Sequence, residues 1–483
     1  MNWLYKVALV CCLFCGLIGC FDSRRQAFDL KHSEGSSLKY DPPVPERWKL
    51  SNGLEIVFLK NDELPLLQGT LYFRRGSLSL PQISPGIVAA TGSQIRLGGA
   101  GDYTALQLDT ELEKLSASIS SDISNEFGGV SFSGLVSDRE KLFKLFSSVV
   151  LAPRFEESRL ALWKGQTLEA ISRRKEDPDV VSNIAFNQLL YGDSPYGYVL
   201  KSDLVKKIKR VDLLRVHRQI ARPDRAIFAI SGAIDLKELD RLVKKYFGDW
   251  EPRNFDLPPP PNLEVSQRTG IFLIELPFEQ STIIMGQRGI KRLSPQHIPS
   301  LIFNDIFGTG GFSARLVQIV RVDLGLAYSA YGAVVPGIVQ GKNLIGIQTK
   351  SESTVVAMEA AMRVLKGMQS KPVSKTELSE TKRSIENSFV FKFATQAALV
   401  DRYALLDLLS YPWDYDRTYL DKISNIDLEG VQNVAKSLWD SNNFTVLVVG
   451  NAQACKSVEL AAKEPDFVFA GLPISHLKFN ESI

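Results

Sequence analysis

Cysteine and histidine are scarce in the body of this 483-residue chain. Four of its five cysteines lie within the first twenty residues, and only Cys455 lies further along. A mature chain starting at Cys20 would keep two cysteines, too few for a disulfide framework or a multi-cysteine metal site. No two histidines have the spacing of metal ligands, so we expect surface or structural roles for them. The four are His32, His217, His297 and His476.

A large excess of charge is also absent. Lys and Arg total 57 and Asp and Glu total 54, which gives a net charge of +3. Basic clusters such as Arg173-Arg174-Lys175 alternate with acidic and apolar residues at helical spacing, which is typical of solvated helix faces. The composition, 45% hydrophobic and 23% charged, is that of a folded globular protein. The sequence therefore gives no reason to expect nucleic acid as a partner.

The N-terminal apolar run, Val7 to Ile18, is too short to span a bilayer comfortably. It follows Lys6, so residues 1–19 are predicted to be an export signal. The residues before and including Cys20 (LIGC) resemble a bacterial lipobox, which implies that Cys20 is lipidated and holds the protein to an envelope membrane. Phe21 after the cysteine favours the periplasmic face of the outer membrane. The alternative is a plain secretory signal with a chance cysteine.

Two breaks divide the rest of the chain. Residues 20–43 are polar and predict a flexible tether. Residues 251–268 contain four consecutive prolines, Pro258 to Pro261, which impose an extended segment and exclude a helix. We therefore expect an N-terminal half over residues 44–250 and a C-terminal half over residues 269–483.

The two halves resemble each other. Residues 225–232 and 443–450 are both apolar strand patterns that end at glycine. The same chain distance separates residues 155–160 from 373–378, and each of these segments opens a helix after a proline. Strand patterns precede these helices, and residues 130–136 alternate cleanly between apolar and polar. These repeated patterns predict a duplicated, two-lobed α+β molecule, and we expect a substrate to lie between the lobes.

Several segments resemble one peptidase family in order and spacing. They are 48–57, 64–66, 73–77, 169–178, 191–197, 280–283, 307–316 and 324–329. Together they are similar to the insulinase/pitrilysin-type peptidases, the inverzincin group that includes the mitochondrial processing peptidase. The resemblance covers nearly the whole body of the chain. It implies two homologous α+β halves, each an antiparallel-dominated sheet packed with helices, arranged as a clam-shell.

The zinc motif of that family is missing here. An inverzincin carries H-x-x-E-H, in which two histidines bind zinc and the glutamate takes a proton from the metal-bound water. At the matching positions this chain has Ala89, Gly92 and Ser93. Glu169 matches the third ligand, but one carboxylate cannot hold a catalytic zinc ion. We expect no cofactor in this chain, and Glu169 is most simply a vestige or a helix-surface carboxylate.

A second family feature is retained. In bacterial relatives an arginine and a tyrosine of the C-terminal half donate hydrogen bonds and positive charge to the oxyanion formed at the scissile peptide. The resemblance places Arg321 and Tyr328 in these roles. Without the resemblance, Arg321 would be read as ending a helix and Tyr328 as packing in a strand.

A strand containing Ser120, Ser121 and Asp122 matches the one that pairs with extended substrates in relatives. Such pairing uses backbone amides and is largely independent of side chains. The other interpretation is ordinary polar alternation at a sheet edge. The sequence does not decide between these two interpretations.

The leading hypothesis is an envelope lipoprotein that is the non-zinc, substrate-binding subunit of a heteromeric peptidase. Its expected partners are a zinc-bearing subunit of the same family, peptide substrates and a membrane reached through the lipid anchor. The chain alone is expected to be inactive, with zinc in the partner. The alternative is a peptide-binding or scaffold protein of the cell envelope with no role in proteolysis. A zinc peptidase acting alone is disfavoured, because both imidazoles and the glutamate base are absent.

Overall fold

The computed structural model describes residues 42–252 and 267–480. The predicted signal segment 1–19, Cys20, nearly all of the tether and most of the linker lie outside the described residues. Across the described ranges, every helix is too short or too polar to span a bilayer.

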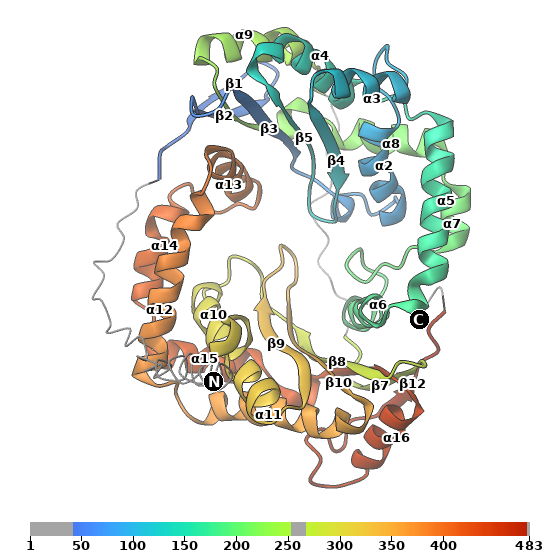
Figure 1. The fold of residues 1–483 in the computed structure, drawn as a ribbon, viewed down its shortest axis with the longest axis vertical. Coiled ribbons are helices and arrows are strands. Elements are labelled where there is room, and N and C mark those ends of the chain that lie inside the picture. Colours follow the sequence, from blue (N-terminus) through green and yellow to red (C-terminus); the bar gives the residue numbers. More distant parts are fainter. Residues whose placement is uncertain (1–41, 253–266, 481–483) are drawn as a thin grey trace, which may run out of the picture. The chain divides into compact units, whose positions relative to one another are not determined.

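The described residues form two six-stranded sheets (Figure 1). Five strands of each sheet follow the same order, and the sixth, outer strand differs between them. The first contains β1 (Glu46–Lys49), β2 (Glu55–Lys60), β3 (Leu66–Phe73), β4 (Ser118–Ile123), β5 (Gly128–Leu135) and β6 (Ala226–Gly232), in the order β1-β2-β6-β3-β5-β4. The second contains β7 (Gly270–Glu275), β8 (Gln280–Arg288), β9 (Ala327–Val335), β10 (Lys342–Lys350), β11 (Thr445–Gly450) and β12 (Ile474–His476), in the order β12-β7-β11-β8-β10-β9. Most neighbouring strands pair antiparallel. The predicted α+β fold with two similar, antiparallel-dominated halves is confirmed.

Helices pack on both sheets. In the first half they are α2 (Pro85–Leu97), α3 (Ala105–Lys114), α4 (Arg139–Leu151), α5 (Glu157–Arg173), α6 (Pro178–Tyr191), α7 (Ser202–Lys207), α8 (Arg210–Ile220) and α9 (Leu236–Phe247). In the second half they are α10 (His297–Asn304), α11 (Thr354–Ser370), α12 (Lys375–Phe389), α13 (Gln396–Leu408), α14 (Tyr415–Ser424), α15 (Leu428–Leu438) and α16 (Ala452–Ala461). Two π-helical turns, Asp305–Thr309 and Val317–Asp323, and a 3₁₀ turn, Val390–Phe393, lie between them.

Sequence periodicity accounts for these elements. The central strands β6 and β11 are buried along their whole length, because helices cover both faces of each sheet. Helix α4 buries the apolar stripe that contains Leu142 and Phe146 in the first core. Helix α12 begins with a capping box, in which Ser374 accepts from the Glu377 amide and the Glu377 carboxylate accepts from the Ser374 amide.

The halves exchange one helix each. By position in the chain α6 belongs to the first half, but it packs against β8 and β11 of the second sheet. Helix α13 belongs to the second half and packs against β2, β3 and β6 of the first sheet (Figure 1). One core cluster accordingly joins Phe186 and Leu189 of α6 to Ile284 and Val449 of the second sheet. The two halves therefore stabilise each other through shared cores.

Candidate functional site

Helix α2 carries the three positions where the family motif would place histidine, glutamate and histidine. Ala89 is exposed, Ser93 is half-buried, and Gly92 is buried where α2 packs on β4. A Cβ atom on Gly92 would lie 2.3 Å from the Ile123 nitrogen and 2.9 Å from the Asp122 carbonyl carbon. Cβ atoms do not approach a backbone this closely, so β4 fills the space that a side chain at position 92 would need.

Ser121 connects the predicted substrate strand to this helix. Its hydroxyl donates to the Gly92 carbonyl oxygen at 2.6 Å and accepts from the Arg96 amide at 3.1 Å. These two backbone groups are four residues apart on α2 and would ordinarily bond to each other, so the hydroxyl is inserted into the helix ladder. Ser121 therefore holds β4 against α2, whereas Ser120 and Asp122 are exposed on the edge strand.

The retained carboxylate lies apart from any metal-binding group. Glu169 is exposed on α5, with Arg173 as a charged neighbour. Within residues 42–252 and 267–480, no three side chains of His, Cys, Asp or Glu gather as metal ligands. Because α2 offers no imidazole and β4 occupies the space beside Gly92, the residues at the family's zinc position do not fit a zinc ion. No catalytic step can be assigned to zinc held by these residues.

The described histidines are held by neighbouring groups. His217 Nε2 lies 2.8 Å from the Val150 carbonyl oxygen, His297 Nδ1 lies 2.6 Å from the Arg292 carbonyl oxygen, and His476 bonds to the Glu459 carboxylate. His32 lies outside the described residues. These contacts agree with the structural and surface roles expected for the three described histidines.

Arg321 and Tyr328 lie side by side. The Arg321 guanidinium carbon is 5.8 Å from the centroid of the Tyr328 ring and 5.2 Å from that of Phe312. Both rings are open to solvent, with Tyr328 73% and Phe312 67% exposed. Among the described residues the guanidinium has no acidic partner, so its charge is available to an approaching anion or oxyanion. Phe312 was missed in the sequence, although it belongs to the glycine-rich run 307–316.

A β-bulge positions Tyr328. Strand β9 is an edge strand, and its pairing with β10 aligns Ser329 with Gln348 but Ala327 with Thr349. Tyr328 is thus the extra residue, without a partner across the ladder. Bulges of this kind redirect a side chain and increase local twist, and they are common beside functional sites. Arg321 lies on the π-helical turn just before the strand, another irregularity that is frequent at functional sites.

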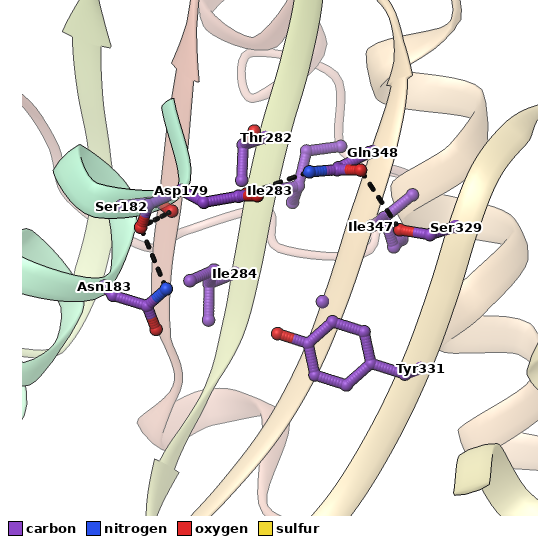
Figure 2. Close-up of a pocket in the computed structure, with 11 residues that line it drawn as sticks. Asp179, Ser182, Asn183, Thr282, Ile283, Ile284, Ser329, Tyr331, Ile347 and Gln348 are labelled. Atoms are coloured by element: carbon purple, nitrogen blue, oxygen red, sulfur yellow. Dashed lines mark hydrogen bonds between the residues drawn. The ribbon is translucent and has the colours of Figure 1, made fainter. Parts of the chain in front are cut away.

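A pocket of about 300 Å³ is lined by residues of α6, β8, β9 and β10. Figure 2 shows the side chains that α6 and these strands contribute to it. Gln348 Nε2 donates to Asp179 Oδ1 at 2.9 Å, and the Ser329 hydroxyl donates to Gln348 Oε1 at 3.4 Å. The Tyr331 ring lies across Gly346, whose Cβ would be 2.3 Å from that ring. Burial, and secondarily the Asp179 carboxylate, raises the pKa of Tyr331 above 10.0. Sequence reasoning missed this pocket, because the motif that starts α6 predicts a helix but not the sheet it covers.

A smaller pocket of about 250 Å³ lies beside β4 on the first sheet. It is lined by Thr70, Tyr72, Ser120, Ser121, Asp122, Phe127, Gly128, Gly129 and Ser131. Burial first, and then the Asp401 carboxylate of α13, raises the pKa of Tyr72. The predicted substrate residues therefore border a polar hollow at the edge of the sheet.

Known proteins resemble this chain along most of its length. Residues 207–385 match the family model described as Peptidase M16 inactive domain. The "Non-peptidase homolog YmxG" of Helicobacter pylori is 23% identical over 413 residues, covering 83% of this chain and 93% of that protein. A solved peptidase M16 inactive domain from Pseudomonas fluorescens has a TM-score of 0.76 at 22% identity, covering 84% and 98% of the two chains. The periplasmic protease PqqL of Escherichia coli has a TM-score of 0.72 at 18% identity, covering 86% of this chain and 46% of that one.

Proposed function

We propose that this chain, which belongs to the M16 (insulinase/pitrilysin-like) family of peptidases, binds peptides and completes the active site of a zinc-bearing partner. The match of residues 207–385 confirms the family resemblance read from the sequence. The chain is a non-catalytic homologue, and its packing at Gly92 agrees with that description. The partner, the peptide and the anchor are the parts of this function that we propose.

The contact between Arg321 and Tyr328 carries the proposal. A guanidinium that has no acidic partner in the described part of the chain, beside an exposed phenol, can supply hydrogen-bond donors and one positive charge to a developing oxyanion. A scaffold protein has no chemical reason to keep such a group, because the exposed rings of Tyr328 and Phe312 leave apolar surface in water. The bulge at Tyr328 supports the same interpretation. With regular pairing to β10, the Tyr328 side chain would point to whichever face of the sheet the strand alternation gives it, and the bulge redirects it.

Two edge strands favour an extended peptide as the ligand. Strands β4 and β9 end their sheets, so one side of each backbone is left without a strand partner in its sheet. An extended peptide can add to such an edge through main-chain hydrogen bonds, with little dependence on its sequence. Tyr328 lies at the start of β9 and Arg321 lies on the turn before it, where a peptide bond held along that edge would meet them.

Reconstitution tests the proposed function. The native protein, purified from membranes with its companions, should bring with it a family member that carries an intact H-x-x-E-H motif. We expect the chain alone to contain no stoichiometric zinc and to leave unstructured peptides uncleaved, and the complex to cleave them. Cleavage by the partner at the same rate without this chain would contradict the proposal and favour the scaffold alternative.

We further propose that Cys20 is acylated and anchors the protein at the periplasmic face of the outer membrane. Each acyl methylene buried in a bilayer contributes about 0.8 kcal/mol, so several chains hold more firmly than the few charges of residues 20–43. Cys20→Ser should therefore move the protein from the membrane fraction to the soluble envelope fraction, as measured by fractionation and immunoblotting. A Ser37→Ala variant serves as the control. Unchanged membrane association of Cys20→Ser would rule out the lipid as the anchor.

A further inference from the structure

A cavity of about 510 Å³ lies among α10, the 3₁₀ turn Val390–Phe393, α13 and α14. Its lining does not include Arg321, Phe312 or Tyr328. Its walls combine leucines and tyrosines with three basic side chains. The lining residues are Arg292, His297, Leu301, Lys392, Ala398, Asp401, Arg402, Leu405, Leu406, Leu409, Tyr411, Tyr415 and Tyr419. Helices α10, α13 and α14 are labelled in Figure 1. The volume lies within the range of small-molecule sites.

Two of the three basic groups are already neutralised by acids. Arg402 binds Asp416 with both prongs of its guanidinium, and its Nε lies 2.7 Å from Asp416 Oδ2. Arg292 Nη1 lies 3.2 Å from Glu126 Oε2. These pairs leave neither arginine with a full uncompensated charge.

Lys392 is the exception. Its Nζ lies over the rings of Tyr419, at 4.4 Å, and Phe389, at 5.4 Å, and it has no carboxylate partner among the described residues. The side chain is open to the cavity, but the surrounding protein lowers the pKa of Lys392 to about 8, first through loss of solvation and then through Arg402. Asp416, whose charge acts on Lys392, is bonded to Arg402, and Asp401 on the same wall is hydrogen-bonded to Tyr72 and Thr70. Within the described part of the chain, the Lys392 ammonium therefore faces the cavity without an ion pair.

Phenol groups beside this ammonium also lack partners. Tyr415 is 8% exposed and Tyr419 is 3% exposed, yet within the described part of the chain neither hydroxyl has a hydrogen-bond partner. The two hydroxyl oxygens are not fully buried, so they are open to the cavity and can donate to a ligand that enters it. The Tyr411 hydroxyl lies 3.3 Å from His297 Nδ1 on the same wall.

We propose that this cavity binds a monoanionic carboxylate carried on an apolar or aromatic group. Lys392 would pair with the carboxylate of the ligand, and the phenols of Tyr415 and Tyr419 would donate hydrogen bonds to polar atoms of the ligand. The leucines would enclose its apolar part. One uncompensated cation suits a single negative charge better than a phosphate, which generally requires several donors and charges. The ligand could be a free acid or the C-terminal carboxylate of a peptide. The inference does not depend on the proposed peptidase role.

Calorimetry on the purified full chain tests this inference with phenylacetate, phenylacetamide and inorganic phosphate. We expect phenylacetate to bind at least tenfold more tightly than the isosteric amide, and phosphate not to displace it. N-acetylphenylalanine and its amide form the second arm. Binding of both acids supports the proposal for free acids, and binding of only the peptide-like acid assigns the site to peptide C-termini. Equal affinity for acid and amide, tighter binding of phosphate, or no binding would each overturn it.

Variants locate the binding. Lys392→Met should abolish the preference for acid over amide, Lys392→Arg should restore most of it, and the exposed Lys436→Met is the matched control. Lys392 makes no ion pair, and the loss of its cation–π contacts costs little, so Lys392→Met should unfold at nearly the temperature of the parent. An unchanged preference in Lys392→Met would refute the assignment.

The pH dependence provides a further readout. The protonated ammonium binds the acid, so the preference should be full at pH 7 and should fall as pH rises above about 8. For the imidazole and the phenols that face the cavity, the pKa shifts lead away from this window. Burial lowers the pKa of His297 below 6.5, raises those of Tyr411 and Tyr419 to about 12, and also raises that of Tyr415. Burial raises the pKa of the Asp401 carboxyl on the same wall, and the two arginines make ion pairs with Glu126 and Asp416.

Discussion

In a reconstituted complex with a zinc-bearing partner, Arg321→Ala and Tyr328→Phe should each lower kcat by about 10²- to 10³-fold, roughly 2.7 to 4 kcal/mol. The loss should appear in kcat and in kcat/KM alike, because hydrogen bonds to the oxyanion strengthen only as negative charge develops. Tyr328→Phe is the more selective test, since it removes only the hydroxyl and keeps the ring that faces Arg321. Steady-state cleavage of a quenched fluorescent peptide measures both effects.

The control must be an arginine without a structural partner. Arg315 is unsuitable, because it makes two hydrogen bonds of 2.8 Å to Glu377, the residue that also caps α12. Arg383 is exposed on α12, and Arg383→Ala should leave kcat within about twofold of the parent. Full activity in the Arg321→Ala/Tyr328→Phe double variant would exclude the oxyanion role and leave the scaffold alternative.

Local patterns in the sequence predicted local structure well. The alternating residues 130–136 fall almost entirely in β5, and Ser374 and Glu377 form the predicted capping box of α12. The apolar runs that end at Gly232 and Gly450 are the buried central strands β6 and β11. These features depend on residues close in the chain, where side-chain spacing directly determines which face is buried.

Long-range packing could not be read in the same way. The apolar face of α6 shows that the helix is buried but not that its contacts come from the other half's sheet. The cavity around Lys392 likewise takes its walls from four separate elements. Arg321 and Tyr328 were picked out together only through the family resemblance, whereas the bulge at Tyr328 depends on pairing with β10, which the sequence does not show.

Gly92 shows why the family's zinc site cannot be recovered by restoring its three side chains. Replacing Ala89, Gly92 and Ser93 by His, Glu and His should destabilise the protein rather than produce a zinc peptidase, and Gly92→Glu alone should account for most of the loss. A Cβ at position 92 would overlap the backbone of Ile123 and Asp122, and the added carboxylate would be buried without a partner. We expect a loss of about 3 kcal/mol or more in the free energy of unfolding.

Differential scanning fluorimetry and elemental analysis measure these outcomes together. Ala89→His is the matched control, because position 89 is exposed on the same helix, and it should change stability by less than about 0.5 kcal/mol. Gly92→Ala should fall between the two, since its Cβ still meets the Ile123 amide at 2.3 Å. A triple variant that folds normally, binds one zinc per chain and cleaves peptides would show that β4 can move away from α2 at little cost in stability. In that case the missing side chains, and not the packing of α2 on β4, would be what keeps this chain from binding zinc.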